Sequence, residues 1–162
     1  MSGLVATSGV SFAAGRMRPS ATITDRAIVP FMAELDYAFI AEFAKVENGK
    51  LTAVGASYLD VQPPIFPAAH SFSVAGRIRA PEGTDAIALR IRIIPPGNAM
   101  NIVLNWSINP GPETEPYDGK IGFLFAVQAA IALVAEGLCE IFVDIDTVQQ
   151  RRLAFRISPP PR

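Results

Sequence analysis

The side chains that most often carry out chemistry in proteins are scarce in this sequence of 162 residues. It contains one histidine, His70, and one cysteine, Cys139. Nucleophilic catalysis needs an activating base beside the nucleophile, and structural zinc needs four convergent ligands. His70 follows a proline-rich link and Cys139 alternates with aliphatic residues, so we interpret both as structural. The sequence therefore indicates a non-catalytic protein, and we expect no cofactor.

Carboxylates offer one route to a metal site. Asp144 and Asp146 are two positions apart in a predicted strand, which places both on one face. Oxygen ligands at this spacing could share Ca²⁺ or Mg²⁺ with acids from a loop. The other interpretation is a hydrated strand end that leads into a turn. Glu113, Glu115 and Asp118 in the longest irregular stretch are a similar case, which we interpret first as a hydrated loop and second as a site. A divalent-metal or small-ligand protein or enzyme is therefore an alternative function.

Arginine placement gives a second candidate surface. Four arginines alternate with apolar residues in two consecutive predicted strands: Arg77, Arg79, Arg90 and Arg92. If those strands pair, the guanidinium groups form one patch that could bind carboxylates or phosphates. No interleaved aromatic residues would stack on bases, and charged outer faces also protect ordinary sheets from aggregation. Anion or nucleic-acid binding is thus an alternative, with a protein preferred as the partner.

The composition limits which cellular compartment and which class of partner we expect. A net charge of −1 and a pI near 5.8 give no overall field toward nucleic acid or an anionic membrane. The longest apolar run, 121–135, is shorter than the ~20 residues that span a bilayer. A single cysteine excludes an internal disulfide and fits a reducing compartment. We expect a cytoplasmic protein that does not bind a membrane. We expect its partner to be another protein or a second copy of itself.

The strongest structural signal is Asn48-Gly49 between two β-rich runs. A type I′ hairpin turn needs positive φ at both central residues, which these residue types favour. The turn then pairs Glu47 with Lys50, Phe43 with Val54 and, further along, Phe39 with Tyr58. The predicted core face carries alternate residues of the two runs: Leu35, Tyr37, Phe39, Ala41, Phe43, Val54, Ala56 and Tyr58.

Apolar and polar residues also alternate over 71–80, 87–94, 139–145 and 152–157. Pro95-Pro96-Gly97-Asn98 predicts a four-residue hairpin loop that pairs Ile91 with Ile102 and Leu89 with Leu104. The run 121–135 suits a buried strand or a buried helix, and we predict a strand because its neighbours are strands. About eight strands without alternating helices predict an all-β fold, an antiparallel β-sandwich.

The length suits a single domain. We divide the chain into a flexible leader, 1–31, a β-sandwich domain, 32–158, and a proline-rich tail, 159–162. The leader lacks a sustained period of 2 or 3.6 residues. We expect translation, or at least the folded domain, to begin near Met32.

Several blocks resemble the N-terminal half of a family of small uncharacterised bacterial proteins, a domain of unknown function. They are LDYAF at 35–39, NGKL at 48–51, VGAS at 54–57, FPAAH at 66–70 and VAGRIR at 74–79. The resemblance implies a compact β domain in the bacterial cytoplasm and transfers no activity, ligand or site residue. We therefore expect a non-catalytic β-sandwich interaction module that binds a protein partner or self-associates.

Overall fold

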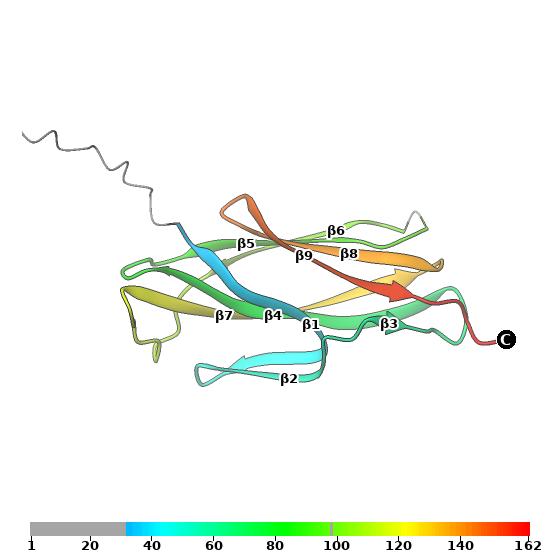
Figure 1. The fold of residues 1–162 in the computed structure, drawn as a ribbon, viewed down its shortest axis with the longest axis horizontal. Coiled ribbons are helices and arrows are strands. Elements are labelled where there is room, and N and C mark those ends of the chain that lie inside the picture. The colour runs from blue at the N-terminus through cyan, green and yellow to red at the C-terminus, as the bar shows by residue number, and fades with distance from the viewer. Residues whose placement is uncertain (1–31, 98) are drawn as a thin grey trace, which may run out of the picture.

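A computed structural model describes residues 32–97 and 99–162, in which every regular element is a β-strand (Figure 1). The strands are β1 (Glu34–Glu47), β2 (Lys50–Ala56), β3 (Asp60–Val61), β4 (Ala68–Pro81), β5 (Ile87–Ile94), β6 (Ile102–Ile108), β7 (Lys120–Leu133), β8 (Gly137–Ile145) and β9 (Val148–Ile157). These described residues include no helix long and apolar enough to cross a membrane. The predicted leader, 1–31, lies outside them.

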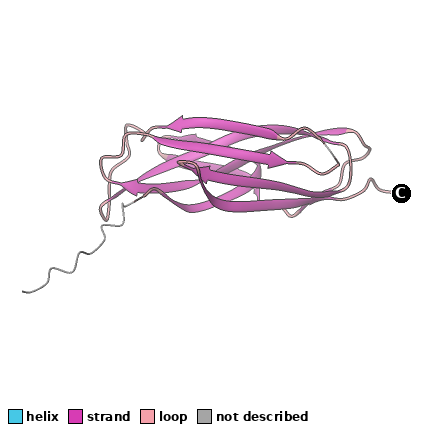
Figure 2. Cartoon of the chain, turned by 90° about the horizontal axis from the view of Figure 1, so that it is seen from above, coloured by secondary structure: helices cyan, strands magenta, loops and turns pink. Residues whose placement is uncertain are grey.

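The strands form two stacked sheets (Figure 2). One has the order β2-β1-β4-β7 and the other β3-β9-β8-β5-β6. All neighbouring strands are antiparallel except β3 and β9, which are parallel. The predicted antiparallel β-sandwich is confirmed, and the run that suited either a helix or a strand is strand β7.

The main core lies between the two sheets. In β5, Ile87, Leu89, Ile91 and Ile93 are buried, and the residues between them are more accessible to solvent. This period of two is expected of a strand with one covered face. Burying each such aliphatic side chain contributes about 1.5–3 kcal/mol to folding. Burial of these four side chains therefore stabilises the packing of β5 against the opposite sheet.

The predicted hairpin is confirmed at its turn. Asn48 and Gly49 have φ of 50° and 67°, and Glu47 pairs with Lys50 as the turn requires. The predicted pairing of Phe39 with Tyr58 is wrong. The chain turns at Ser57, whose φ is 61°, and Tyr58 leaves the hairpin to pack against the main core.

The predicted core face of the first strand is correct at Leu35 and wrong from Tyr37 onward. The pairing of β1 with β4 shifts by one residue between Leu35 and Tyr37, so β1 contains a bulge. Side chains alternate along a strand, and one inserted residue therefore exchanges its two faces. Leu35, Ala38 and Ile40 pack on the main core. Tyr37 and Phe39 stack on each other on the outer face, with ring centroids 6.3 Å apart.

Beyond Ala41 the hairpin leaves β4, and Figure 1 shows β2 outside the two layers. Ser73 of β4 fixes this departure, because its Oγ accepts a 3.0 Å hydrogen bond from the Ala44 N–H. A second, smaller buried cluster lies beneath the hairpin: Ala41, Ala44 and Ala75, with Phe39, Leu51 and Ala126 packed against them. Phe43 and Val54, predicted in the core, are 42% and 57% exposed on the other side of the hairpin.

The hairpin of β5 and β6 differs from the prediction by two residues. Leu89 pairs with Trp106 and Ile91 with Leu104, which leaves 95–101 as the connection. Pro95 and Pro96 have no N–H to donate to a ladder, and the structure accommodates them in this longer loop. A slip of two residues preserves the direction of every side chain, so the predicted buried face is correct.

Gly76 lies where β1, β4 and β7 approach one another most closely. A Cβ at this position would overlap the Tyr37 carbonyl oxygen and lie 2.8 Å from Phe125 Cζ. We expect Gly76→Ala to lower the free energy of unfolding by about 2 kcal/mol, because backbone atoms must move. Urea denaturation measures the change. Gly122→Ala is the control, since its Cβ meets only Arg77 Cδ, at 3.8 Å; equal losses in both variants would contradict this prediction.

Candidate functional site

The candidate site is a groove between two sheet edges. β7 and β6 each end their sheet, and no described strand pairs with the outer edge of either. A cavity of about 360 Å³ lies between them and touches residues 106–109 from β6 onward and residues 124–127 of β7. Consecutive residues point to opposite faces of a sheet. A cavity that touches four residues in a row therefore runs along the edge of each strand.

The groove is mainly apolar. Its apolar lining comes from β5, β6, β7 and the tip of the β1–β2 hairpin: Val46, Leu89, Trp106, Ile108, Leu124, Phe125, Ala126 and Val127. Trp106 pairs with Leu89 at a position that faces inward, yet it is 41% exposed. The sandwich is thus open on this side, and apolar surface that would complete a core faces solvent.

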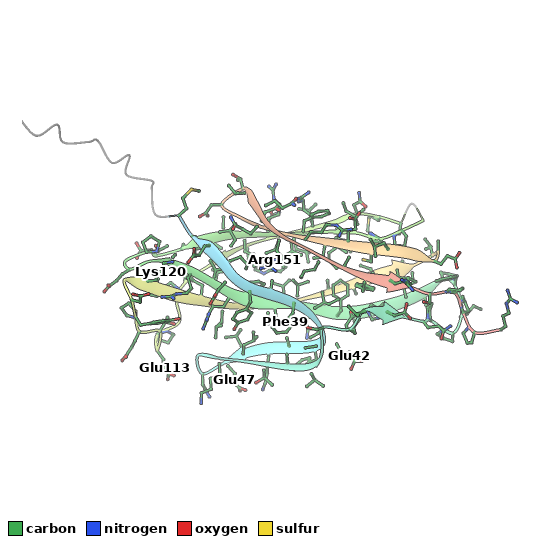
Figure 3. All side chains as sticks on the ribbon, viewed as in Figure 1. Phe39, Glu42, Glu47, Glu113, Lys120 and Arg151 are labelled. Atoms are coloured by element: carbon green, nitrogen blue, oxygen red, sulfur yellow. The ribbon has the colours of Figure 1, made fainter. Side chains whose placement is uncertain are left out.

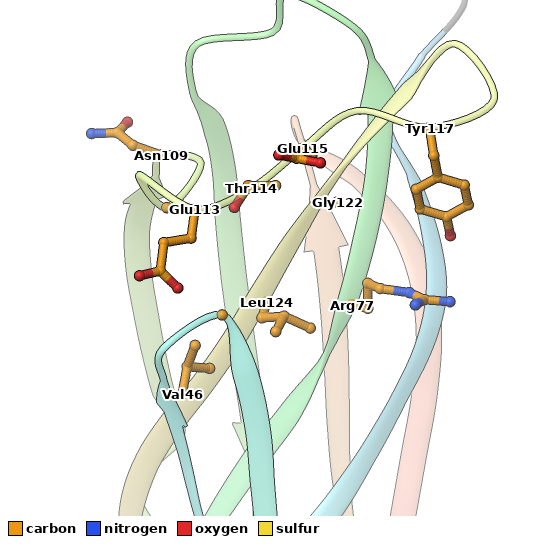
Figure 4. Close-up of a pocket in the computed structure, with 11 residues that line it drawn as sticks. Val46, Arg77, Asn109, Glu113, Thr114, Glu115, Tyr117, Gly122 and Leu124 are labelled. Atoms are coloured by element: carbon orange, nitrogen blue, oxygen red, sulfur yellow. The ribbon is translucent and has the colours of Figure 1, made fainter.

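A second cavity, of about 370 Å³, continues the groove toward the start of β7 (Figure 4). The two cavities share Val46, Asn109 and Leu124. The second is lined by the long connection 109–119, which joins β6 to β7, and by the hairpin tip. Figure 3 shows the connection, marked by Glu113, at the same end of the molecule as the hairpin tip, marked by Glu47.

The second cavity is acidic. Glu113 and Glu115 line it, and Figure 4 shows Glu113 extending toward the hairpin tip. Neither carboxylate has a hydrogen bond or ion pair with another described residue. Arg77 lies on the far side, where its Nε donates a 2.6 Å hydrogen bond to Asp36. This bond raises the pKa of Arg77 and neutralises its charge locally, so two carboxylates are uncompensated.

The end of the connection is anchored to the first sheet. The Arg79 guanidinium lies 4.0 Å from the centroid of the Tyr117 ring and donates a 2.9 Å hydrogen bond to the Tyr117 carbonyl. Tyr117 and Lys120 exchange two backbone hydrogen bonds, and Lys120 forms an ion pair with Glu34. These contacts hold the acidic connection beside the start of β7.

The predicted patch of four arginines does not form. It required pairing of the strands that carry them, but β4 pairs with β1 and β7, whereas β5 pairs with β6 and β8. The segment after Pro81 crosses between the sheets instead of closing a hairpin. Arg77 and Arg79 therefore lie on one sheet and Arg90 and Arg92 on the other. Arg90 donates a 3.0 Å hydrogen bond to Asn105 on its own sheet.

The two aspartates predicted as metal ligands have protein partners. Asp144 is 5% exposed and accepts hydrogen bonds from Arg92 Nε at 2.8 Å and from Nη2 at 3.0 Å, which raise the pKa of Arg92. Asp146 lies in the β8–β9 turn, and its Oδ1 accepts a 3.1 Å hydrogen bond from the Ala88 N–H. No group of three or more His, Cys, Asp or Glu in the described part of the chain could hold a metal ion.

His70 and Cys139 lie in or beside the core. The Tyr58 hydroxyl and His70 Nε2 share a 3.0 Å hydrogen bond, and the His70 ring stacks on Phe72. Burial lowers the pKa of His70, although Glu42 opposes this shift. Burial also raises the pKa of Cys139 to about 12, which suppresses the reactive thiolate. These environments support the structural interpretation of both residues.

The residues of the groove were missed at the sequence level. In the sequence, Trp106 and Val46 look like ordinary residues of amphipathic strands. The apolar run of β7 looks like a strand that is covered on both faces. Only the absence of charge from 121–133 was a signal, and it indicates an exposed edge only once the strand order is known. In the sequence, Glu113 and Glu115 stand out only as acids of a long loop.

His70 should make stability depend on pH. Its pKa in the folded protein is below the ordinary value of about 6.5, so the unfolded chain binds more protons between these two values. The His70 contribution is fully present above pH 6.5 and is lost as the pH falls toward the folded pKa. Urea denaturation across this range measures the slope. We expect it to shrink in His70→Gln, which does not titrate; an unchanged slope would refute this role.

Divalent ions should not stabilise the protein through Asp144 and Asp146, because both carboxylates already accept hydrogen bonds. We expect the melting temperature to be the same with Ca²⁺, Mg²⁺, Mn²⁺ or chelator, since only a ligand that favours the native state raises it. Thermal melts of the full chain test this. An ion-dependent increase that disappears in Asp146→Asn would contradict our interpretation.

Comparison with known proteins places the chain in a family without assigning an activity. A comparison with curated proteins finds no match. Residues 36–158 match a family model described as a family of unknown function (DUF6941). The matched range covers all but the first two residues of the β-sandwich. The chain therefore belongs to DUF6941, a family of unknown function.

Proposed function

We propose that this chain is a non-catalytic interaction module that binds an extended segment of a protein partner along the free edge of β7. The character of that edge carries the proposal. β7 has 14 residues, pairs with β4 without a bulge, and has no charged side chain in 121–133. Folded proteins commonly protect an edge with charge, proline, a bulge or short length. An edge without these features is suited to accept another strand.

The other sheet edges are less suited to this role. β2 and β6 have seven residues each, and β3 has two. β2 also contains Gly55 at a φ of 60°, which interrupts its extended form. β7 extends over about 45 Å at ~3.3 Å per residue. Length, regularity and lack of charge thus favour β7 as the binding edge.

The groove supplies the specificity that an added strand needs. In strand addition, main-chain hydrogen bonds give affinity, and pockets for alternate side chains give specificity. Side chains on one face of the added strand would enter between β7 and β6 and contact Trp106 and Ile108. Those on the opposite face would lie beside the hairpin that crosses β7 at Ala126.

We also propose the bacterial cytoplasm as the site of action. The support is the single cysteine, Cys139, which is buried and unpaired as a free thiol in a reducing compartment would be. Self-association through the same β7 edge is the alternative use of the surface, and the experiment below distinguishes it from binding of a partner.

Random peptides displayed on phage, selected against the immobilised full chain, test the proposal. Two double variants place charges of opposite sign on the exposed face of the edge: Gln128→Lys/Ala130→Lys and Gln128→Glu/Ala130→Glu. We expect both to weaken binding of selected peptides at least about tenfold, because either charge opposes addition of an apolar strand. Ala53→Lys, on exposed β2, is the control and should bind as the wild type.

Trp106 is the only tryptophan in the chain, so its fluorescence reports on the groove. Selected peptides should shift its emission to shorter wavelength as water leaves the indole. Absence of selected peptides, or binding by both double variants that is as tight as binding by the wild type, would contradict the proposal. A dimer that Gln128→Lys/Ala130→Lys dissociates would show that the edge serves self-association instead.

A further inference from the structure

The binding edge runs past an apolar groove at 124–127 and then an acidic cavity at the start of β7, and these two surfaces define the segment that fits it. Resting on the function proposed above, we infer that the partner is a strand antiparallel to β7, with apolar side chains at alternate positions and Lys or Arg on its C-terminal side. The apolar groove and the acidic cavity share part of their lining, so one extended chain can occupy both.

The apolar part of the motif follows from the groove. Side chains of Leu89, Trp106 and Ile108 line it from the opposing sheet. In an added strand, every second side chain points toward these residues. A polar side chain there would lose water without gaining a partner, which is costly. Alternate apolar residues are therefore required where the strand passes Phe125 and Val127.

The basic part follows from unequal charge in the second cavity. Glu113 and Glu115 have no partner among the described residues, whereas Asp36 compensates Arg77, the cationic residue of the lining. A basic side chain placed there completes two ion pairs at modest desolvation cost, because the cavity is open to solvent. The attraction has a short range, because the Debye length at physiological salt is about 8 Å and charges farther apart are largely screened.

The direction follows from the chain path. Glu113 and Glu115 belong to the connection that leads into Lys120, the first residue of β7. All strand pairs in this sheet are antiparallel, and antiparallel pairing is slightly more stable per residue. The C-terminal end of an antiparallel partner lies where β7 begins. The basic residues must therefore follow the apolar strand.

Two synthetic peptides of the same composition test the order. One alternates Thr and Val and ends in Lys-Lys; the other begins with Lys-Lys, and both have acetylated and amidated ends. Titration against the full chain, read by Trp106 emission, should show at least about fivefold tighter binding of the first. The preference for the peptide that ends in Lys-Lys should disappear in the double variant Glu113→Gln/Glu115→Gln. It should also disappear in 1 M salt, where the Debye length is only about 3 Å.

Glu136→Gln is the matched control, because this exposed residue lies beyond the other end of β7. It should keep the preference. The inferred motif would be overturned, and the proposed function left intact, by equal affinities of the two peptides or by tighter binding of the peptide that begins with Lys-Lys. The same holds if neither peptide binds while phage-selected peptides still bind. Failure of all peptides to bind the β7 edge would overturn both. A stable dimer through this edge would overturn the inferred motif, because the strand added to β7 would then come from a second copy of the chain.

Discussion

β4 and β7 pair along all fourteen residues of each strand, and this ladder determines what the rest of the structure can do. It places one face of β7 on the main core and gives that strand a regular register without a bulge. It also satisfies only one of its edges. An edge strand has unpaired N–H and C=O groups on its outer side. The same interaction that stabilises the first sheet therefore creates the surface proposed for binding.

The groove depends further on the bulge between Leu35 and Tyr37. By exchanging the faces of β1, the bulge directs Ile40 into the main core and leaves Phe39 outside. The outer apolar surface then holds the hairpin across β7, where Val46 forms a wall of both cavities. One inserted residue thus links the fold of β1 to the shape of the candidate site.

Local signals predicted local structure well. Asn48-Gly49 predicted both the turn and its register, because a type I′ turn is specified by its two central residues. The face of β1 and the separation of Arg77 from Arg90 depend on contacts between distant strands, which no local pattern encodes. The edge position of β7 is of the same kind. In sequence, an uncharged strand at an edge looks like one in the middle of a sheet.

Hydrogen exchange of the β7 amides in the free full chain tests the central claim most directly. If the outer edge of β7 is open, protection alternates along 121–133: amides bonded to β4 exchange slowly and the intervening ones exchange fast. The part of β8 that pairs regularly with both β9 and β5, 140–143, serves as the internal reference and is protected at every position. Uniform protection of β7, equal to that of β8, would show that its outer edge is already paired and would contradict the account.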